Sequence, residues 1–389
     1  MLLRTLRFPV NELRLFSLKR SVQHLHGPLE VATQSTEAVV LCVVKDGENL
    51  VQAFIEHYLQ LGCKHLFFLD NGSTDSTCTI IKSYEKTTLV TSSKPFSRYY
   101  VLFKNYLIQA FGKGKWCIVA DIDEFLQLPR NTRLEKILTY LNDRAYDAVC
   151  IQMLDMFSKA GLPLSAPTTE LSSNPDKENK QAANKRWTLK QLQSVFCYYD
   201  LKDLDRRQYV RRFQSRVHPA HRFLYGGIRK TVFDCDCFLT KEALFFGHKS
   251  TRLVSSHLLN RSTLADFSCA FLHYKFTDDF YASALKAVAA ENHWRNSSEY
   301  KAYLKVLTAT DSKTDPRTEL KTDSKTELTL YQPSSQRLEH IDDLNQAGFL
   351  FSSDEFTMFL SGAVQQEYTQ QEYIQQEYRA KTYGKKDVR

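Results

Sequence analysis

Short apolar segments alternate with amphipathic helical segments between residues 38 and 154, and this alternation constrains the fold more than any other feature of the chain. Apolar runs of this length, rich in β-branched residues, are typical of buried strands, whereas apolar residues three and four apart indicate helices. Strands that alternate with helices form parallel, right-handed α/β sheets. The expected strands are residues 38–44, 64–69, 87–91, 116–120 and 147–154, and the expected helices are 48–61, one that ends near 84, 99–111 and 134–141.

Two carboxylates, Asp121 and Asp123, follow the apolar run 116–120. Alternation along an extended chain sends both to one side and Ile122 to the other. Carboxylate oxygens suit Mg²⁺ or Mn²⁺, and ligands bind at the carboxyl ends of strands in open α/β sheets. The pair therefore predicts a metal site, with a solvated acidic turn as the alternative.

Two further acids follow other expected strands. Asp70 begins the turn Asp70-Asn71-Gly72-Ser73-Thr74-Asp75, where it could accept a hydrogen bond from a nucleobase or simply form the turn. With Asp121 and Asp123 it outlines a cradle for a nucleoside diphosphate along one sheet edge. Asp155 follows the 147–154 strand and is the candidate general base, with loop capping as its alternative role.

Several blocks of the sequence together resemble the family 2-like glycosyltransferases of the GT-A fold, in the subgroup with an Asp-x-Asp-Glu-Phe signature. The resemblance covers roughly residues 38–292, and Lys45-Asp46 departs from relatives, which usually have Asn before the Glu. The matching blocks are Lys45-Asp46-Gly47-Glu48, Glu56-His57-Tyr58, Leu61-Gly62, Asp70-Asn71-Gly72-Ser73-Thr74-Asp75, Asp121-Ile122-Asp123-Glu124-Phe125-Leu126, Gly226-Gly227-Ile228-Arg229-Lys230, Lys241, Ser256-His257 and Leu272-His273-Tyr274-Lys275-Phe276.

The resemblance implies an α/β fold with a Rossmann-like, nucleotide-binding mixed sheet flanked by helices. It also implies metal-dependent transfer of a sugar, with inversion, from a nucleotide sugar to a glycan, lipid or protein, with Mn²⁺ or Mg²⁺ as cofactor. His257 and His273 are alternatively core histidines, and Arg229 and Lys275 are alternatively surface charges rather than diphosphate ligands. The implied nucleotide-sugar contacts are Asp46, Glu48, Asp70, Asp121, Arg229 and Lys275, and the implied metal ligands are Asp121, Asp123, His273 and His257.

The chain divides by composition into four parts. Residues 1–35 form a basic leader, and residues 36–305 form the transferase domain, with a nucleotide-sugar half (36–157) and an acceptor half (158–305). Residues 306–335 are a low-complexity linker with repeated Asp-Ser-Lys-Thr segments. Residues 336–389 are a C-terminal extension with Gln-Glu-Tyr repeats.

Composition limits the location and the partners of the protein. Nine scattered cysteines, mostly in apolar runs, favour reduced thiols in the cytoplasm, and no apolar run reaches the roughly 18 residues of a membrane span. The basic N-terminus allows peripheral contact with an anionic membrane. A net charge of +8 permits anionic partners, but no nucleic-acid-binding motif is present.

Two rival functions remain open. A phosphatase of the haloacid-dehalogenase type would use Asp121 as nucleophile and Asp123 as acid. Those sites need a small residue where Phe125 stands, and they place this strand first in the sheet, whereas three expected strands precede it here. A non-catalytic protein that binds polyanions or membrane surfaces through its basic segments is the second rival.

Overall fold

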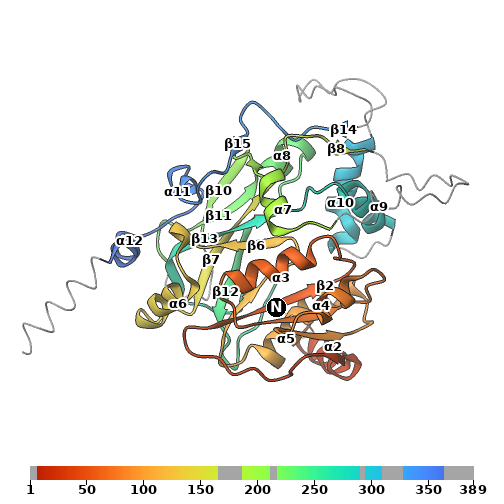
Figure 1. The fold of residues 1–389 in the computed structure, drawn as a ribbon, viewed down its shortest axis with the longest axis vertical. Coiled ribbons are helices and arrows are strands. Elements are labelled where there is room, and N and C mark those ends of the chain that lie inside the picture. The colour runs from red at the N-terminus through yellow and green to blue at the C-terminus, as the bar shows by residue number, and fades with distance from the viewer. Residues whose placement is uncertain (1–6, 165–185, 211–216, 290–293, 309–326, 363–389) are drawn as a thin grey trace, which may run out of the picture.

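A nine-stranded mixed sheet with helices on both faces forms the centre of the computed structural model (Figure 1). The structure describes residues 7–164, 186–210, 217–289, 294–308 and 327–362. The strand order is β1-β4-β3-β2-β5-β12-β7-β13-β6. These strands are β1 (Gln23–His26), β2 (Ala38–Val44), β3 (His65–Asp70), β4 (Thr87–Thr91), β5 (Trp116–Val119), β6 (Glu124–Gln127), β7 (Ala148–Asp155), β12 (Thr240–Phe246) and β13 (Leu264–His273).

Helices cover the sheet, and the described residues also form three separate two-stranded sheets. The helices are α2 (Arg7–Ser21), α3 (Val51–Gln60), α4 (Thr77–Lys82), α5 (Phe96–Phe111), α6 (Leu134–Asp143), α7 (Leu189–Val195), α8 (Ile228–Phe233), α9 (Phe280–Ala289), α10 (Trp294–Thr308), α11 (Asp343–Gln346) and α12 (Asp354–Ser361), with a 3₁₀ turn at Pro129–Asn131. The strand pairs are β10 (Leu204–Gln208) with β11 (Arg222–Gly226), β8 (Leu162–Pro163) with β14 (Glu327–Leu328), and β9 (Tyr198–Tyr199) with β15 (Gln336–Arg337).

The direction of the strands matches the sequence analysis. Strands β4, β3, β2 and β5 run parallel, and β12 runs antiparallel between β5 and β7. Strand β7 pairs in parallel with β13, and the edge strands β1 and β6 are antiparallel to their neighbours. The predicted α/β class, with a mixed sheet flanked by helices, is confirmed.

Both faces of the central strands are buried, which explains their continuous apolar runs. Along β2, alternate residues from Ala38 to Val44 pack in the same core cluster as Phe54 and Tyr58 of α3. The residues between them, Val39 and Leu41, pack in a second cluster with α5 and α2. Strand β2 therefore joins two layers of helix.

The chain leaves the middle of the sheet at the end of β5 and re-enters it at the edge strand β6. Strand β5 ends at Val119, in the middle of the sheet, and residues 120–123 lead directly into β6, which pairs only with β13. The segment that carries Asp121 and Asp123 is therefore a connection between distant strands and not the tip of an extended strand.

Several predicted boundaries need correction. The boundary at 305/306 falls inside α10, and residues 327–362 pack on the fold, with Leu344 and Phe356 buried in the main core. Both sets of repeats lie outside the described residues. Helix α8 begins directly after Gly226 and Gly227, which adopt positive φ (84° and 63°) and turn the chain.

The basic leader is also part of the fold. Strand β1 pairs with β4 at the sheet edge, and Leu15 and Leu18 of α2 are buried in the same core cluster as residues of α5. Within the described part of the chain, we find no helix that is both long and apolar enough to span a bilayer.

We expect Phe356→Ala to lower the free energy of unfolding by about 3–5 kcal/mol, the usual cost of truncating a fully buried aromatic side chain. The Phe356 ring is fully buried and stacks on Phe267 with 3.8 Å between ring centroids. Urea unfolding measures the change. Met358→Ala, in the same helix but 49% exposed, is the control and should cost no more than about 0.5 kcal/mol. Equal effects of the two substitutions would contradict the docking of α12.

Candidate functional site

Strand register brings residues of three sequence segments together at one end of the sheet. His273, the last residue of β13, is paired with Asp155 of β7 on one side and with Glu124 of β6 on the other. The backbone N–H of Tyr274 donates to the carbonyl of Asp123 at 2.8 Å. The sheet itself therefore fixes His273 between the two acidic segments.

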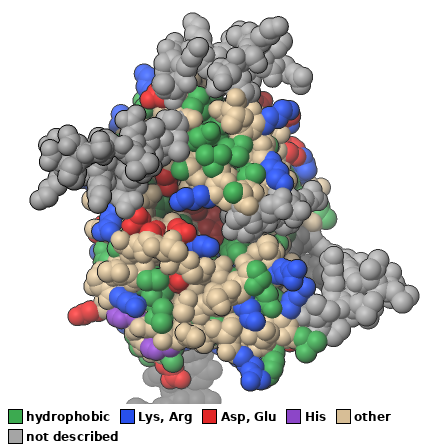
Figure 2. All heavy atoms as spheres, turned by 90° about the vertical axis from the view of Figure 1, so that its right-hand side faces the viewer, with side chains coloured by type: hydrophobic (Ala, Val, Ile, Leu, Met, Phe, Trp, Pro, Cys, Tyr) green, Lys and Arg blue, Asp and Glu red, His purple; other side chains and the backbone are tan. Residues whose placement is uncertain are grey.

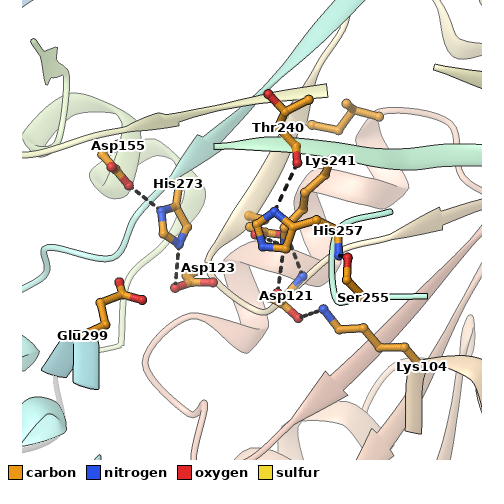
Figure 3. Close-up of polar contacts among 12 residues, drawn as sticks. Lys104, Asp121, Asp123, Asp155, Thr240, Lys241, Ser255, His257, His273 and Glu299 are labelled. Carbon is orange, nitrogen blue, oxygen red and sulfur yellow. Dashed lines mark hydrogen bonds and ion pairs between the residues drawn. The ribbon is translucent and has the colours of Figure 1, made fainter. Parts of the chain in front are cut away.

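Asp123 and His273 form the centre of the site (Figure 3). His273 Nε2 lies 3.1 Å from Asp123 Oδ2, and the Asp123 side chain is 26% exposed. Burial disfavours a charged imidazole, but the Asp123 and Asp155 carboxylates outweigh it and raise the pKa of His273 to about 9. Burial likewise opposes ionisation of Asp123, but His273 and Lys275 lower its pKa to about 2.

Asp121 contacts different partners from Asp123, although the sequence analysis placed both on one side of a strand. Lys104 Nζ of α5 lies 2.7 Å from Asp121 Oδ1, and Lys241 Nζ of β12 lies 2.9 Å from Oδ2. These two ammonium groups outweigh burial and hold the pKa of Asp121 well below its usual range. Because both oxygens are ion-paired, Asp121 does not fit the predicted role of metal ligand, although its side chain is 37% exposed.

Asp155 and Arg229 do not occupy the positions expected of a general base and a diphosphate ligand. Both side chains are buried, and Arg229 donates to both carboxylate oxygens of Asp155, at 2.8 Å from Nε and 2.6 Å from Nη2. Burial works against the charged carboxylate, but Arg229 and His273 hold the pKa of Asp155 well below its usual range. A buried carboxylate so strongly bound is a poor proton acceptor, which disfavours Asp155 as the general base; the predicted roles of Asp155 and Arg229 stay predictions.

Lys275 lies beside this network and is partly buried, with 13% of its side chain exposed. Its Nζ lies 3.7 Å from Glu299 of α10 and 3.3 Å from the Tyr300 hydroxyl. Glu299 Oε1 also lies 3.2 Å from Arg229 Nη1. Although burial opposes its ionisation, Lys275 and Arg229 lower the pKa of Glu299 to about 2. Lys275 thus lies near Asp123, but its ammonium group is already paired with Glu299.

His257 lies on the Asp121 side of the site and not with Asp123 (Figure 3). Its Nδ1 lies 3.1 Å from the Thr240 carbonyl oxygen, and its ring stacks on Phe238. Burial, and then Lys241 and Lys104, hold the pKa of His257 well below its usual range, so the ring is neutral at pH 7. His257 therefore does not fit the predicted role of metal ligand.

Asp46, Glu48 and Asp70 join the loops that follow β2 and β3. Asp46 accepts a hydrogen bond from the Thr74 N–H at 2.7 Å, and Glu48 accepts one from the Ser76 N–H at 3.1 Å. Asp70 is buried and accepts from the N–H groups of Gly72 and Ser73 that follow it. These acids shape the two loops, and their predicted contacts with a nucleotide stay predictions.

Figure 2 shows acidic and basic side chains gathered in a hollow across the middle of one face. Three charged residues of the site were not singled out individually by the sequence analysis: Lys104, Glu124 and Glu299. Lys104 carried a signal, since it lies one turn from Ile108 on the apolar, buried face of α5. Glu299 lies in α10, beyond the blocks of the resemblance, and had no such signal.

The residues fit a divalent cation. Among the described residues, one group of three side chains brings possible ligand atoms within 4.8 Å of one another: Asp123, Glu124 and His273. Glu124 is engaged, because its oxygens bind Lys241 and accept from the Asp121 N–H. A carboxylate and an imidazole therefore remain, a pair that suits Mn²⁺ better than Mg²⁺, which prefers oxygen ligands alone.

One protein-family model matches part of the chain. The model of glycosyltransferase family 92 matches residues 38–192, less than half of the chain, which include Asp121 and Asp123 but not His273. The match confirms the predicted class, a glycosyltransferase. The finer likeness to family 2 with its Asp-x-Asp-Glu-Phe signature is not confirmed by it.

Two solved structures are similar over part of the chain. A mannosyltransferase, PcManGT, from Pyrobaculum calidifontis, solved with GDP-Man and Mn²⁺, is 19% identical over 38% of this chain and 45% of its own, with a TM-score of 0.26. Glucosyl-3-phosphoglycerate synthase from Mycobacterium tuberculosis, solved with Mn²⁺, UDP and glucosyl-3-phosphoglycerate, is 14% identical over 31% of this chain and 44% of its own, with a TM-score of 0.22. The chain thus spans less than half the length of either protein. The comparison with curated proteins finds no match.

The metal-free protein should lose stability between pH 6.5 and 9. Because the folded-state pKa of His273, about 9, lies above its ordinary value of 6.5, the charged ring stabilises the fold below pH 6.5, and this contribution is lost as the pH rises through 9. We expect a loss of roughly 1–3 kcal/mol in unfolding free energy, measured with urea in the presence of a chelator. His273→Gln should lack this component, and a wild-type profile no steeper than that of the variant would contradict it.

Proposed function

We propose that the protein transfers a sugar from a nucleotide-diphosphate sugar to an acceptor hydroxyl, with a divalent cation, Mn²⁺ in preference to Mg²⁺, held by Asp123 and His273. The observation that carries the proposal is the 3.1 Å approach of Asp123 Oδ2 to His273 Nε2, where parallel strands end. A cation bound there would neutralise the charge that develops on the diphosphate as the glycosidic bond breaks.

The charge balance of the site supports a cation. Each of its cationic side chains is paired with a carboxylate. The pairs are Lys104 with Asp121, Lys241 with Glu124, His273 with Asp123, Arg229 with Asp155, and Lys275 with Glu299. An incoming diphosphate therefore meets no unpaired cation in this set of described side chains. Its charge is best compensated by a divalent ion, which takes the place of the Nε2 proton of His273.

Within this proposal Asp121 and Asp123 have separate roles. Asp123 holds the cation, and Asp121, fixed by Lys104 and Lys241 and partly exposed, accepts hydrogen bonds from hydroxyl groups of the donor. In this proposal the acceptor hydroxyl displaces the diphosphate in a single step, which inverts the configuration of the transferred sugar. A glycan, a lipid or a protein is the proposed class of acceptor.

The contacts of Asp121 disfavour the phosphatase alternative. That reaction requires an Asp121 oxygen free for in-line attack on phosphorus. Both oxygens are held by lysine ammonium groups instead, and Phe125 is buried behind the segment.

Nucleotide binding tests the proposal by thermal unfolding. UDP or GDP, and their sugar conjugates, should raise the melting temperature in the presence of Mn²⁺ but not of EDTA, because a ligand that binds only the folded state stabilises it by about 2.7 kcal/mol at 100 times its Kd. Asp123→Asn should abolish the metal-dependent shift. Asp143→Asn, an exposed acid at the end of α6, is the control and should retain it. A folded protein that no nucleotide stabilises with Mn²⁺ would refute the proposal.

We also propose that α2 contacts an anionic membrane surface, with the protein placed in the cytoplasm. Leu13 and Phe16, three residues apart, are 69% and 59% exposed, and Lys19 and Arg20 are exposed beside them. Helix α2 lies at the lower right of Figure 1, and the lower half of Figure 2 shows basic and apolar side chains close together. Exposed apolar residues beside cations are typical of interfacial helices.

Vesicle co-sedimentation measures this contact. The protein should pellet with phosphatidylserine-containing vesicles and less with purely zwitterionic ones, because both apolar burial and charge contribute to binding. The double substitution Leu13→Ser/Phe16→Ser should reduce binding several-fold, since it removes the two exposed apolar side chains. Val254→Ser is the control, because Val254 is an exposed apolar residue outside α2. Equal binding of the double variant and the wild type would exclude α2 as the contact.

A further inference from the structure

A chain of buried polar side chains lies behind His273, on the side of the ring away from Asp123. Asp155 Oδ1 is 2.6 Å from His273 Nδ1, and Arg229 binds both oxygens of Asp155. Glu299 of α10 binds the remaining side of the Arg229 guanidinium. These residues come from β7, α8 and α10, and the first two are almost fully buried.

We infer that Asp155 and Arg229 are positioning residues for His273: they keep the proton on its Nδ1, so that Nε2 presents its lone pair to the cation held with Asp123. The inference rests on the proposed function, since it assigns these residues to that same site. This positioning role differs from the predicted roles of Asp155 as a general base and of Arg229 as a diphosphate ligand.

The hydrogen-bond geometry selects the tautomer. An ionised carboxylate is only an acceptor, so the 2.6 Å contact with Asp155 requires a proton on Nδ1. When that nitrogen carries the proton, Nε2 of the neutral ring has a free lone pair, as a metal ligand must. Histidine ligands in metal sites usually donate their other ring N–H to a carboxylate in this way.

Arg229 keeps Asp155 in the acceptor state and in the right orientation. Its planar guanidinium donates to both carboxylate oxygens, a two-point contact that lysine cannot reproduce. Arg229 Nη2 also lies 2.8 Å from His273 Nδ1. Because guanidinium is a donor, it would favour the opposite tautomer if Asp155 did not accept from Nδ1, so the two residues must act as a pair.

The backbone keeps the parts in register. Asp155 and His273 are Cα partners on adjacent parallel strands, and the Met156 N–H donates to the His273 carbonyl at 2.9 Å. The side-chain contact is therefore built on a sheet ladder and does not depend on a loop. Such rigid support is what precise placement of a ligand requires.

Asp155→Asn tests the inference, because asparagine is nearly isosteric but can offer its NH₂ group to Nδ1 and so favour the proton on Nε2. We expect the affinity for Mn²⁺, titrated by electron paramagnetic resonance of the free ion, to fall 10–100-fold. Arg229→Lys should give a smaller loss in the same direction. Asp266→Asn, a buried aspartate that binds Tyr140 and Ser353 away from the site, is the matched control and should bind Mn²⁺ as the wild type does.

Imidazole ¹⁵N chemical shifts at about pH 10, where the His273 ring is neutral because its pKa is about 9, give a readout that needs neither metal nor substrate. In the metal-free wild type, Nδ1 of His273 should have the shift of a protonated, hydrogen-bonded nitrogen, and Asp155→Asn should move it toward the unprotonated value. A folded Asp155→Asn protein with unchanged His273 shifts and Mn²⁺ affinity would overturn the inference. A wild type that binds no Mn²⁺ but shows the expected ¹⁵N change would refute the proposed function and leave Asp155 as the residue that sets the tautomer.

Discussion

The pairing of buried charges is the constraint on which the whole site depends. Ionised groups that leave water lose several kcal/mol of solvation each, and only close partners of opposite sign restore it. Here five cations and five carboxylates form two rows of ion pairs. One row is Lys104–Asp121–Lys241–Glu124, and the other is Asp123–His273–Asp155–Arg229–Glu299–Lys275. Removal of one member changes the electrostatic surroundings of its neighbours in the same row, so their roles are coupled.

Features that depend on local sequence could be predicted, whereas ion pairs between segments far apart in the chain could not. Periodicity reports whether a segment is a strand or a helix and which side is buried, and so five of the six strands from Ala38 to Asp155 were predictable; β6 (Glu124–Gln127) was not expected. Asp123 was predictable as well, because a carboxylate that follows a buried strand is a local signal. The contact between Asp155 and His273 was not predictable, because these residues are 118 apart in sequence and only the pairing of β7 with β13 brings them together.

The remaining errors have local physical causes. The helix that carries Arg229 was not expected, because a six-residue helix after two glycines is too short to show a helical period. Residues 336–362 pack on the core through a few aromatic side chains, and their position behind a low-complexity linker hid that. Lys104 shows the opposite case: a charge on an otherwise apolar helical face is a local conflict, and such conflicts are expected at functional sites.

The division of labour between Asp121 and Asp123 follows from where β5 ends. If the strand continued to Asp123, alternation would aim both carboxylates at one cation. It ends instead at Val119, and a turn follows in which the Asp121 N–H donates to Glu124 and the Glu124 N–H donates to the Asp121 carbonyl. The turn directs Asp121 toward the lysines of α5 and β12 and Asp123 toward β13. One acid is therefore saturated with positive charge while the other, opposite a single histidine, can still bind a cation.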